Sequence, residues 1–414
     1  MKNKVEKVSN SYWIRLVILF FLGWILMYAT RTIFNPVMGL VGEEFNLTKT
    51  DLGLANSIFF LTYAVAQIPF GVLGDKYGRK LVITVGFIGL AITTFLSGLA
   101  QTFSIFLWIR ALAGIAQGAY YGPQYAMSSE AIPKKKVTLG NALINSGMAF
   151  GTSGGFLLSS SIVLAGGAHW SRPFFLVAIP TAIVGILFYT LLKEKVVIAD
   201  EAVEDQVLPE EEPEQKVSLK DIFTNKNLVA VFIVCFVSIY ANFVILTWLP
   251  TFLIQERGFD GASVGIISSL VPWASIPGAL FFANMKDKIG STKKMMFFLM
   301  PLALLSVFLI ANVTDKTALY AVLVLYGITG KLALDPILIS YVNAYAPKGS
   351  LSTTLSAYNF IGMSGSILAP YVTGYLADKV GSMQIGFYLA SVLLGVGLLQ
   401  FALIAKDTKK QSAS

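Results

Sequence analysis

The chain has 414 residues, of which 55% are hydrophobic and only 13% are charged. A soluble domain carries roughly twice that charged fraction, so the composition excludes an ordinary soluble protein. The net charge of +8 does not indicate a nucleic-acid partner, because the basic residues gather on one side of predicted membrane spans. Apolar runs close to the ~20 residues that cross a bilayer recur along the chain. They are too long for barrel strands, so we expect an all-α integral membrane fold with twelve transmembrane helices.

The predicted spans form two groups of six. Between them, segment 193–227 is polar and acidic, which is typical of a solvated linker. We therefore expect an N-terminal six-helix bundle over 1–192, a cytoplasmic linker over 193–227 and a C-terminal six-helix bundle over 228–414. The expected spans are 13–40, 50–74, 80–101, 104–129, 138–165, 170–192, 228–254, 262–285, 293–313, 317–345, 351–376 and 383–405.

The ends of the spans predict the orientation of the chain. The first span begins at Trp13, has no small-residue cleavage site and continues past Pro36, so we expect a membrane span rather than a signal peptide. Most of the 31 Lys and Arg residues lie in the termini, the linker and the loops on the same side. This bias predicts a plasma (inner) membrane protein with both termini in the cytoplasm. The basic residues expected on the other side are Lys49, Arg172, Arg257, Lys316 and Lys379.

The reactive residue types are scarce. The single cysteine, Cys235, and the single histidine, His169, lie far apart in the sequence. One residue of each kind forms no internal disulfide and gives neither a metal-ligand cluster nor a nucleophile–base pair. We therefore expect no enzyme activity, no metal and no cofactor.

Ionisable residues inside the spans indicate function, because a charge at membrane depth costs several kcal/mol. In the first span, Tyr28-Ala-Thr-Arg31 places an arginine too deep to reach the interface easily. Its planar guanidinium matches a carboxylate or a phosphate. A structural ion pair with Asp335, the only acid expected at membrane depth, is the alternative. Because the buried balance is positive, the sequence favours a path for an anion.

The tenth span carries Lys331 and Asp335 four residues apart, so both lie on one helix face. Separated, Lys331 is expected to bind an anion while Asp335 takes a proton. A static neutral pair that fixes helix packing is the alternative. Pro336 follows directly and is expected to permit a kink near the midplane.

The fourth span carries Arg110, Gly114 and Gly118. Arg110 lies one to two turns inside the outer boundary, where a snorkelling side chain and a gating residue are both compatible with the sequence. The two glycines favour close helix packing rather than a ligand site.

Polar residues at similar depth predict a hydrophilic path. Each alone is typical of interhelical hydrogen bonding, but together they suggest the lining of a cavity. They are Tyr28, Gln67, Gln117, Asn145, Tyr240, Asn242, Tyr358 and Asn359.

The loop after the second span reads GVLGDKYGRK over 71–80. Gly71 is expected to let two helices approach closely, Asp75 to accept hydrogen bonds from a neighbouring helix N-terminus, and Arg79 to supply a bidentate partner. These contacts would stabilise one access state.

A second copy of this loop follows at an offset of 212 residues and keeps Asp287 and Gly290. The same offset maps Tyr28 onto Tyr240. Several matches at one offset indicate a transporter built from two repeats.

With this loop and its repeat, the chain resembles the major facilitator superfamily. The resemblance extends over nearly the whole chain. The resemblance implies alternating access by two bundles around a midplane site. The anion:cation symporters, which carry sugar acids and other carboxylates, share the helix-one arginine and a pattern like Tyr63-Ala-x-x-Gln67-Ile-Pro-x-Gly71. The organophosphate:phosphate antiporters share Tyr28-x-x-Arg31 and Gln117-Gly118 followed by Pro123.

The departures from both branches bear on the substrate. Thr30 and Gln117 stand where the symporters usually carry the acids that couple protons. Asn242 and Gln67 stand where the phosphate exchangers usually carry an arginine and a lysine. The resemblance therefore implies an anionic substrate that is not clearly phosphorylated.

The sequence as a whole predicts a monomeric secondary active transporter in the lipid bilayer that carries a small organic anion, a carboxylate or sugar acid, with proton coupling. The alternatives are an organophosphate/inorganic phosphate exchanger, a multidrug exporter and a non-transporting sensor on a transporter fold. The expected gating residues are Gly71, Asp75, Arg79, Arg110 and Asp287. The expected substrate-binding residues are Arg31, Tyr28, Lys331, Asn145, Asn242, Gln117, Tyr240, Tyr358 and Asn359, with Asp335 as the proton-coupling residue.

Overall fold

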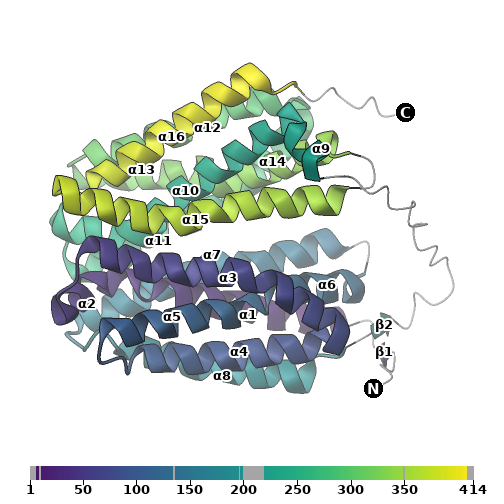
Figure 1. The fold of residues 1–414 in the computed structure, drawn as a ribbon, viewed down its shortest axis with the longest axis horizontal. Coiled ribbons are helices and arrows are strands. Elements are labelled where there is room, and N and C mark those ends of the chain that lie inside the picture. The colour runs from purple at the N-terminus through teal and green to yellow at the C-terminus, as the bar shows by residue number, and fades with distance from the viewer. Residues whose placement is uncertain are drawn as a thin grey trace. The chain divides into compact units, whose positions relative to one another are not determined.

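The computed structural model describes residues 6–8, 11–133, 136–194, 196–198, 219–347 and 350–407. The chain divides into two compact units (Figure 1). Unit 1 comprises residues 1–47, 58–206 and 260–266, and unit 2 comprises residues 48–57, 207–259 and 267–414. The expected all-α membrane fold is confirmed, and the described strands are two three-residue segments.

Unit 1 contains the first six membrane-crossing segments, apart from residues 49–57 of the second segment, and several of the six are interrupted. The first segment breaks after α1 into a short 3-10 turn that contains Pro36, because proline supplies no N–H for a continuing helix. The expected span 104–129 likewise divides into two helices, α5 and α6. A parallel pair of strands joins β1 (Glu6–Val8) to β2 (Val196–Ile198). The helices are α1 (Tyr12–Thr32), η1 (Asn35–Val37), α2 (Met38–Phe45), α3 (Lys49–Tyr77), α4 (Arg79–Ser97), α5 (Phe103–Gly118), α6 (Tyr121–Ala131), α7 (Val137–Ser159), its π-helical continuation Ser160–Ala165, and α8 (Arg172–Leu191).

Unit 2 contains the last six segments, apart from residues 261–266 of the eighth segment, and a short entry helix, α9 (Leu219–Thr224). The tenth segment breaks at Gly330, whose extended backbone (ψ −151°) separates α13 from α14. Pro336, where a kink is expected, lies inside α14. The helices are α10 (Lys226–Gln255), α11 (Gly261–Ile289), α12 (Thr292–Asn312), α13 (Lys316–Thr329), α14 (Lys331–Tyr345), α15 (Leu351–Val380) and α16 (Gln384–Ile404).

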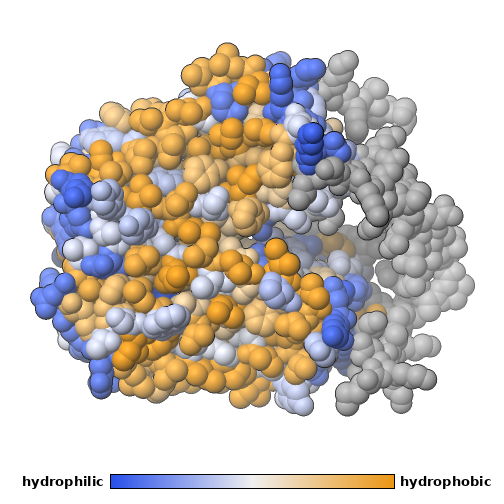
Figure 2. Space-filling view, in the orientation of Figure 1, coloured by the Kyte–Doolittle hydropathy of each residue, from blue (hydrophilic) through white to orange (hydrophobic). Residues whose placement is uncertain are grey.

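The apolar composition and the exposed side chains of these helices are typical of membrane-spanning segments. Within the described residues, 11 helical stretches are long and apolar enough to span a bilayer. The twelfth expected span, 351–376, is helical as α15, but its many Ser, Thr and Gly residues lower its hydropathy. Apolar side chains cover much of the face seen in Figure 2, and hydrophilic ones gather near helix ends. Exposed residues such as Ile68 and Trp108 are therefore suited to contact lipid.

The core of unit 1 is an aromatic cluster that fixes the helices around the site. Phe87 and Phe188 pack edge to face with ring centroids 4.7 Å apart, and Tyr120 lies against both. The Tyr120 hydroxyl donates to the Phe20 carbonyl at 2.9 Å, which joins α1 to the break between α5 and α6. The predicted packing role of Gly114 and Gly118 is confirmed, because a Cβ on either would collide with α3.

Candidate anion-binding site

Arg31 lies in the last turn of α1, immediately before the helix break, and its residue is only 7% exposed. Three aromatic rings surround its guanidinium. The carbon Cζ lies 4.6 Å from the ring centroids of Tyr28 and Tyr63 and 5.7 Å from that of Phe60. The rings of α1 and α3 thus form a cage that excludes water and favours a cation.

The polar partner of Arg31 is an amide. Arg31 Nε donates to Gln117 Oε1 at 2.5 Å, whereas the buried Nη2 has no hydrogen-bond acceptor among the described residues. Within the described part of unit 1, Arg31 forms no ion pair with a carboxylate, and Asp335 pairs instead with Lys331. A buried charged donor without an acceptor is costly, so this atom is suited to receive a ligand oxygen.

Sequence reasoning identified Arg31, Tyr28 and Gln117 but missed Phe60 and Tyr63 as the other walls of the cage. The pattern that begins at Tyr63 is the sequence signal that points to this wall of the cage. The structure brings these five residues together from α1, α3 and α5.

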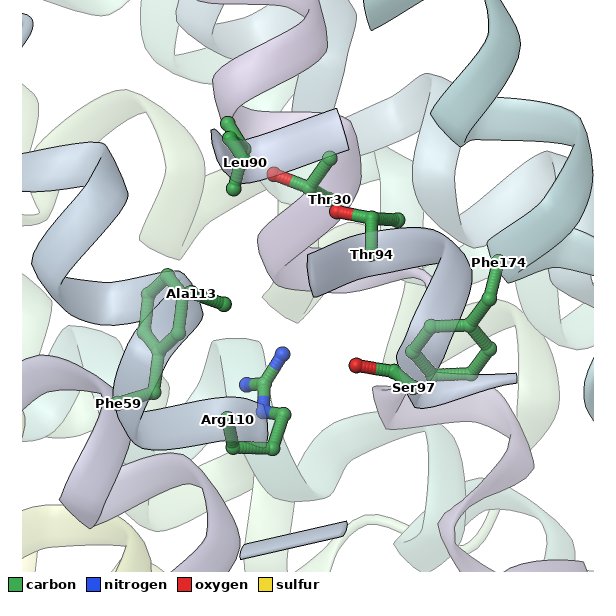
Figure 3. A pocket seen from close by; sticks show the side chains of 8 residues that line it. All are labelled: Thr30, Phe59, Leu90, Thr94, Ser97, Arg110, Ala113 and Phe174. Atoms are coloured by element: carbon green, nitrogen blue, oxygen red, sulfur yellow. The ribbon is translucent and has the colours of Figure 1, made fainter. Parts of the chain in front are cut away.

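Arg110 lies apart from this cage, and the snorkelling alternative is wrong. Its residue is 2% exposed, and its Cζ stacks 4.5 Å from the Phe59 centroid and 5.4 Å from that of Phe34. Its guanidinium and the Ser97 hydroxyl point into one space, shown in Figure 3. That space has no room for a water molecule, which favours a packing role for Arg110 over a ligand site in this conformation. The lining residues are Thr30, Phe59, Leu90, Thr94, Ser97, Arg110, Ala113 and Phe174.

Unit 2 contains an ion pair at the start of α14. Lys331 Nζ lies 2.5 Å from Asp335 Oδ2, and the two side chains are 23% and 24% exposed. The helix begins here because Gly330 breaks the tenth segment, so the pair lies at the positive end of a half-helix. Cys235 is buried beside this region, with its Sγ 3.8 Å from the Tyr358 carbonyl.

The remaining polar residues expected to line a path belong to both units. In unit 1, Asn145 accepts from the Tyr125 hydroxyl at 2.9 Å. In unit 2, Tyr240 is buried and its hydroxyl has no acceptor or donor partner among the described residues. Asn242 and Asn359 are partly exposed, and Tyr358 is buried.

Segment 71–80, which the structure places at the end of α3 and the start of α4, has ion pairs at Arg79, but within the described residues Asp75 does not cap a helix N-terminus as expected. Arg79 pairs with Asp75 at 3.3 Å and with Glu130 at 2.5 Å. The carboxylate at the N-terminus of α4 is Glu194, which accepts from the amides of Arg79 and Lys80 at 2.5 and 2.9 Å. Sequence reasoning missed Glu194 because it lies more than a hundred residues from the loop.

Gly71 and Asp287 are two further residues expected to take part in gating. The close helix contact expected at Gly71 is absent from this structure, since a Cβ there would meet no atom within 4 Å. Asp287 belongs to α11, but its side chain lies outside the described residues.

The comparisons with known proteins agree with this architecture. The family model of the Major Facilitator Superfamily matches residues 20–370 and again 262–414. The chain is 23% identical to the phosphoglycerate transporter protein of Salmonella typhimurium, over 93% of this chain and 87% of that one. It is 25% identical to the hexuronate transporter of Bacillus subtilis, over 94% and 93% of the two chains.

A crystal structure of a bacterial homolog of the human lysosomal transporter Spinster has the same fold. It aligns with a TM-score of 0.80 at 15% identity and covers 96% of this chain and 97% of its own. The fold of two pseudo-symmetric bundles and the family match over most of the chain therefore indicate the same family. The chain is a multi-pass membrane transporter, not an enzyme, and it belongs to the major facilitator superfamily.

Proposed function

We propose that the protein is a secondary active transporter of a small organic anion that bears a carboxylate, such as a sugar acid. It works by alternating access in the plasma (inner) membrane, with both termini in the cytoplasm. The observation that carries this proposal is the buried Arg31 Nη2, which lacks an acceptor among the described residues. A carboxylate oxygen is the acceptor that this charged donor favours. The similarity to a hexuronate transporter supports the same class of substrate.

In this proposal the roles fall to residues of both units. Arg31 binds the anionic group inside the cage formed with Tyr28, and Lys331 assists once Asp335 releases it. Protonation of Asp335 removes one partner of the 2.5 Å ion pair and so couples proton movement to anion binding. The path residues are Asn145, Asn242, Tyr240, Tyr358 and Asn359.

A thermal-shift experiment with purified protein tests the substrate class. D-glucuronate and D-galactonate are expected to stabilise the wild type, because a ligand that binds the folded state raises its stability by mass action. Arg31→Ala is expected to abolish this shift. Arg257→Ala is the matched control, since it removes a guanidinium that donates to the Ala311 carbonyl. Stabilisation of all three proteins by cationic compounds, and by no anion, would overturn the proposal.

Exchange of an organic phosphate for inorganic phosphate is a second candidate, favoured by the similarity to a phosphoglycerate transporter protein. Proteoliposomes loaded with phosphate distinguish the two functions. Phosphate-driven counterflow without a proton gradient would support the exchanger, whereas glucuronate uptake that requires a proton gradient would support the symporter.

A further inference from the structure

Gln117 holds one fixed orientation. It is 1% exposed, and its Nε2 donates to the Met27 carbonyl at 3.0 Å and contacts Thr30 Oγ1 at 3.2 Å. The Thr30 hydroxyl itself donates to the Met27 carbonyl at 2.8 Å. Because a carbonyl only accepts, the NH₂ group must face Met27, and Oε1 must face Arg31.

This orientation determines which edge of Arg31 a ligand reaches. A guanidinium offers two edges for bidentate binding, one formed by Nε and an Nη group and the other by the two Nη groups. Gln117 Oε1 already accepts from Nε at 2.5 Å, so the first edge is occupied. Nη2 belongs to both edges and lacks an acceptor among the described residues. Because Nε is taken, Nη2 can bind a carboxylate in a bidentate pair only together with Nη1, at the second edge.

We propose that Gln117 is a positioning residue that makes Arg31 present its end edge to one carboxylate of the substrate. This inference rests on the proposed function and names its specificity. Both Gln117 N–H groups are used on α1, so the amide is not itself a donor to the substrate.

The charge around Arg31 favours a carboxylate over a phosphate monoester. Its described contacts in unit 1 are an amide and three aromatic rings, all neutral. One guanidinium matches the single charge of a carboxylate, whereas a phosphate monoester carries nearly two charges at neutral pH. Arg110 interacts electrostatically with Arg31, but it stacks on Phe59 beside a space too narrow for water, so it offers a phosphate no direct second contact there.

Three variants test the positioning role with D-glucuronate and glucose 6-phosphate, two hexose probes that differ in their acidic group. Gln117→Leu removes the acceptor from Nε and is expected to lower glucuronate affinity about tenfold. Gln117→Glu places a carboxylate against the guanidinium and is expected to abolish glucuronate binding at about pH 8. Gln124→Leu is the control, since Gln124 is a buried amide that contacts Trp24 and Ser128 instead of Arg31.

Acidification provides a readout that a purely structural role would not give. Lowering the pH to about 5 protonates part of the carboxylate population that Gln117→Glu introduces, so glucuronate binding to this variant is expected to recover. The groups facing Arg31 are the phenols of Tyr28 and Tyr63 and, farther away, Arg110. Between pH 5 and pH 8, phenols ordinarily stay neutral and guanidinium groups stay charged. Any change that protonation of Asp335 causes is shared by the wild type, Gln124→Leu and Gln117→Glu, so recovery specific to Gln117→Glu is the expected result.

The outcomes separate this inference from the proposed function. If the wild type binds neither probe, the proposed function fails. If the wild type binds glucuronate but Gln117→Leu binds as tightly as Gln124→Leu, the positioning role is wrong and the transporter proposal stands. Equal or tighter binding of glucose 6-phosphate by the wild type would overturn the preference for a carboxylate.

Discussion

Glu44 and Glu256 occupy equivalent positions in the two repeats, 212 residues apart, and each carboxylate binds the segment that leads into the sixth helix of its own bundle. Glu44 accepts from the Trp170 indole and lies 3.0 Å from His169 Nε2. Glu256 accepts from the Ser382 hydroxyl at 2.7 Å and from the Met383 amide at 2.5 Å.

The backbone repeats along with these carboxylates. Two residues after each glutamate the chain adopts the left-handed conformation, at Asn46 (φ 53°) and Gly258 (φ 64°). Only glycine and asparagine enter this region readily, so the two repeats keep the turn with different residues. Duplication has thus preserved the contact between first and sixth helices while the donors changed.

We expect Glu256→Ala to lower the free energy of unfolding by about 1–3 kcal/mol, because a buried amide and a hydroxyl lose a charged acceptor. Glu43→Ala changes an exposed glutamate beside Glu44 and should shift stability by no more than about 0.5 kcal/mol. Thermal unfolding in detergent measures both variants. Equal midpoints for the two would show that the contact at Ser382 and Met383 contributes nothing.

The helices and the repeat could be predicted from the sequence because both depend on local properties. Apolar runs predict helices in a bilayer, and a constant offset predicts a repeat. The positions of the helix breaks were harder to predict from the sequence. At Gly330 the backbone is extended, and the carbonyl and ring of Tyr326 leave no room for a Cβ. Pro336, the obvious local signal, lies within an intact helix.

The site was predictable only in part, for a similar reason. Arg31 was identifiable because a charge in an apolar span is unusual. The cage depends on side chains from α3, and the direction of the Gln117 amide depends on a carbonyl of α1. The capping of α4 by Glu194 likewise joins segments distant in sequence. Such pairings require tertiary structure.

Gly114 provides a test of the packing between α3 and α5. A Cβ at this position would overlap the Phe59 carbonyl oxygen, a backbone atom that cannot move aside cheaply. We expect Gly114→Ala to reduce the yield of monodisperse protein in size-exclusion chromatography. Gly122→Ala adds the same methyl group where no atom lies within 4 Å and should leave the yield unchanged. A normal elution profile for Gly114→Ala would contradict the packing seen here.

The Lys331–Asp335 pair distinguishes a proton switch from a static ion pair. If the pair is a switch, Asp335→Asn mimics the protonated state, so uptake of glucuronate into proteoliposomes should persist with a substrate gradient but lose its response to a proton gradient. If the pair only fixes packing, leaving Lys331 without its acid should instead lower stability. The double variant Lys331→Gln/Asp335→Asn should then recover much of that stability, because removing both charges leaves none unpaired.

The adjacent Leu332→Ala, on another face of α14, controls for disturbance of the helix start. Uphill, proton-driven uptake by Asp335→Asn at the wild-type level would refute the coupling role, since no charge would remain at position 335 to bind the proton.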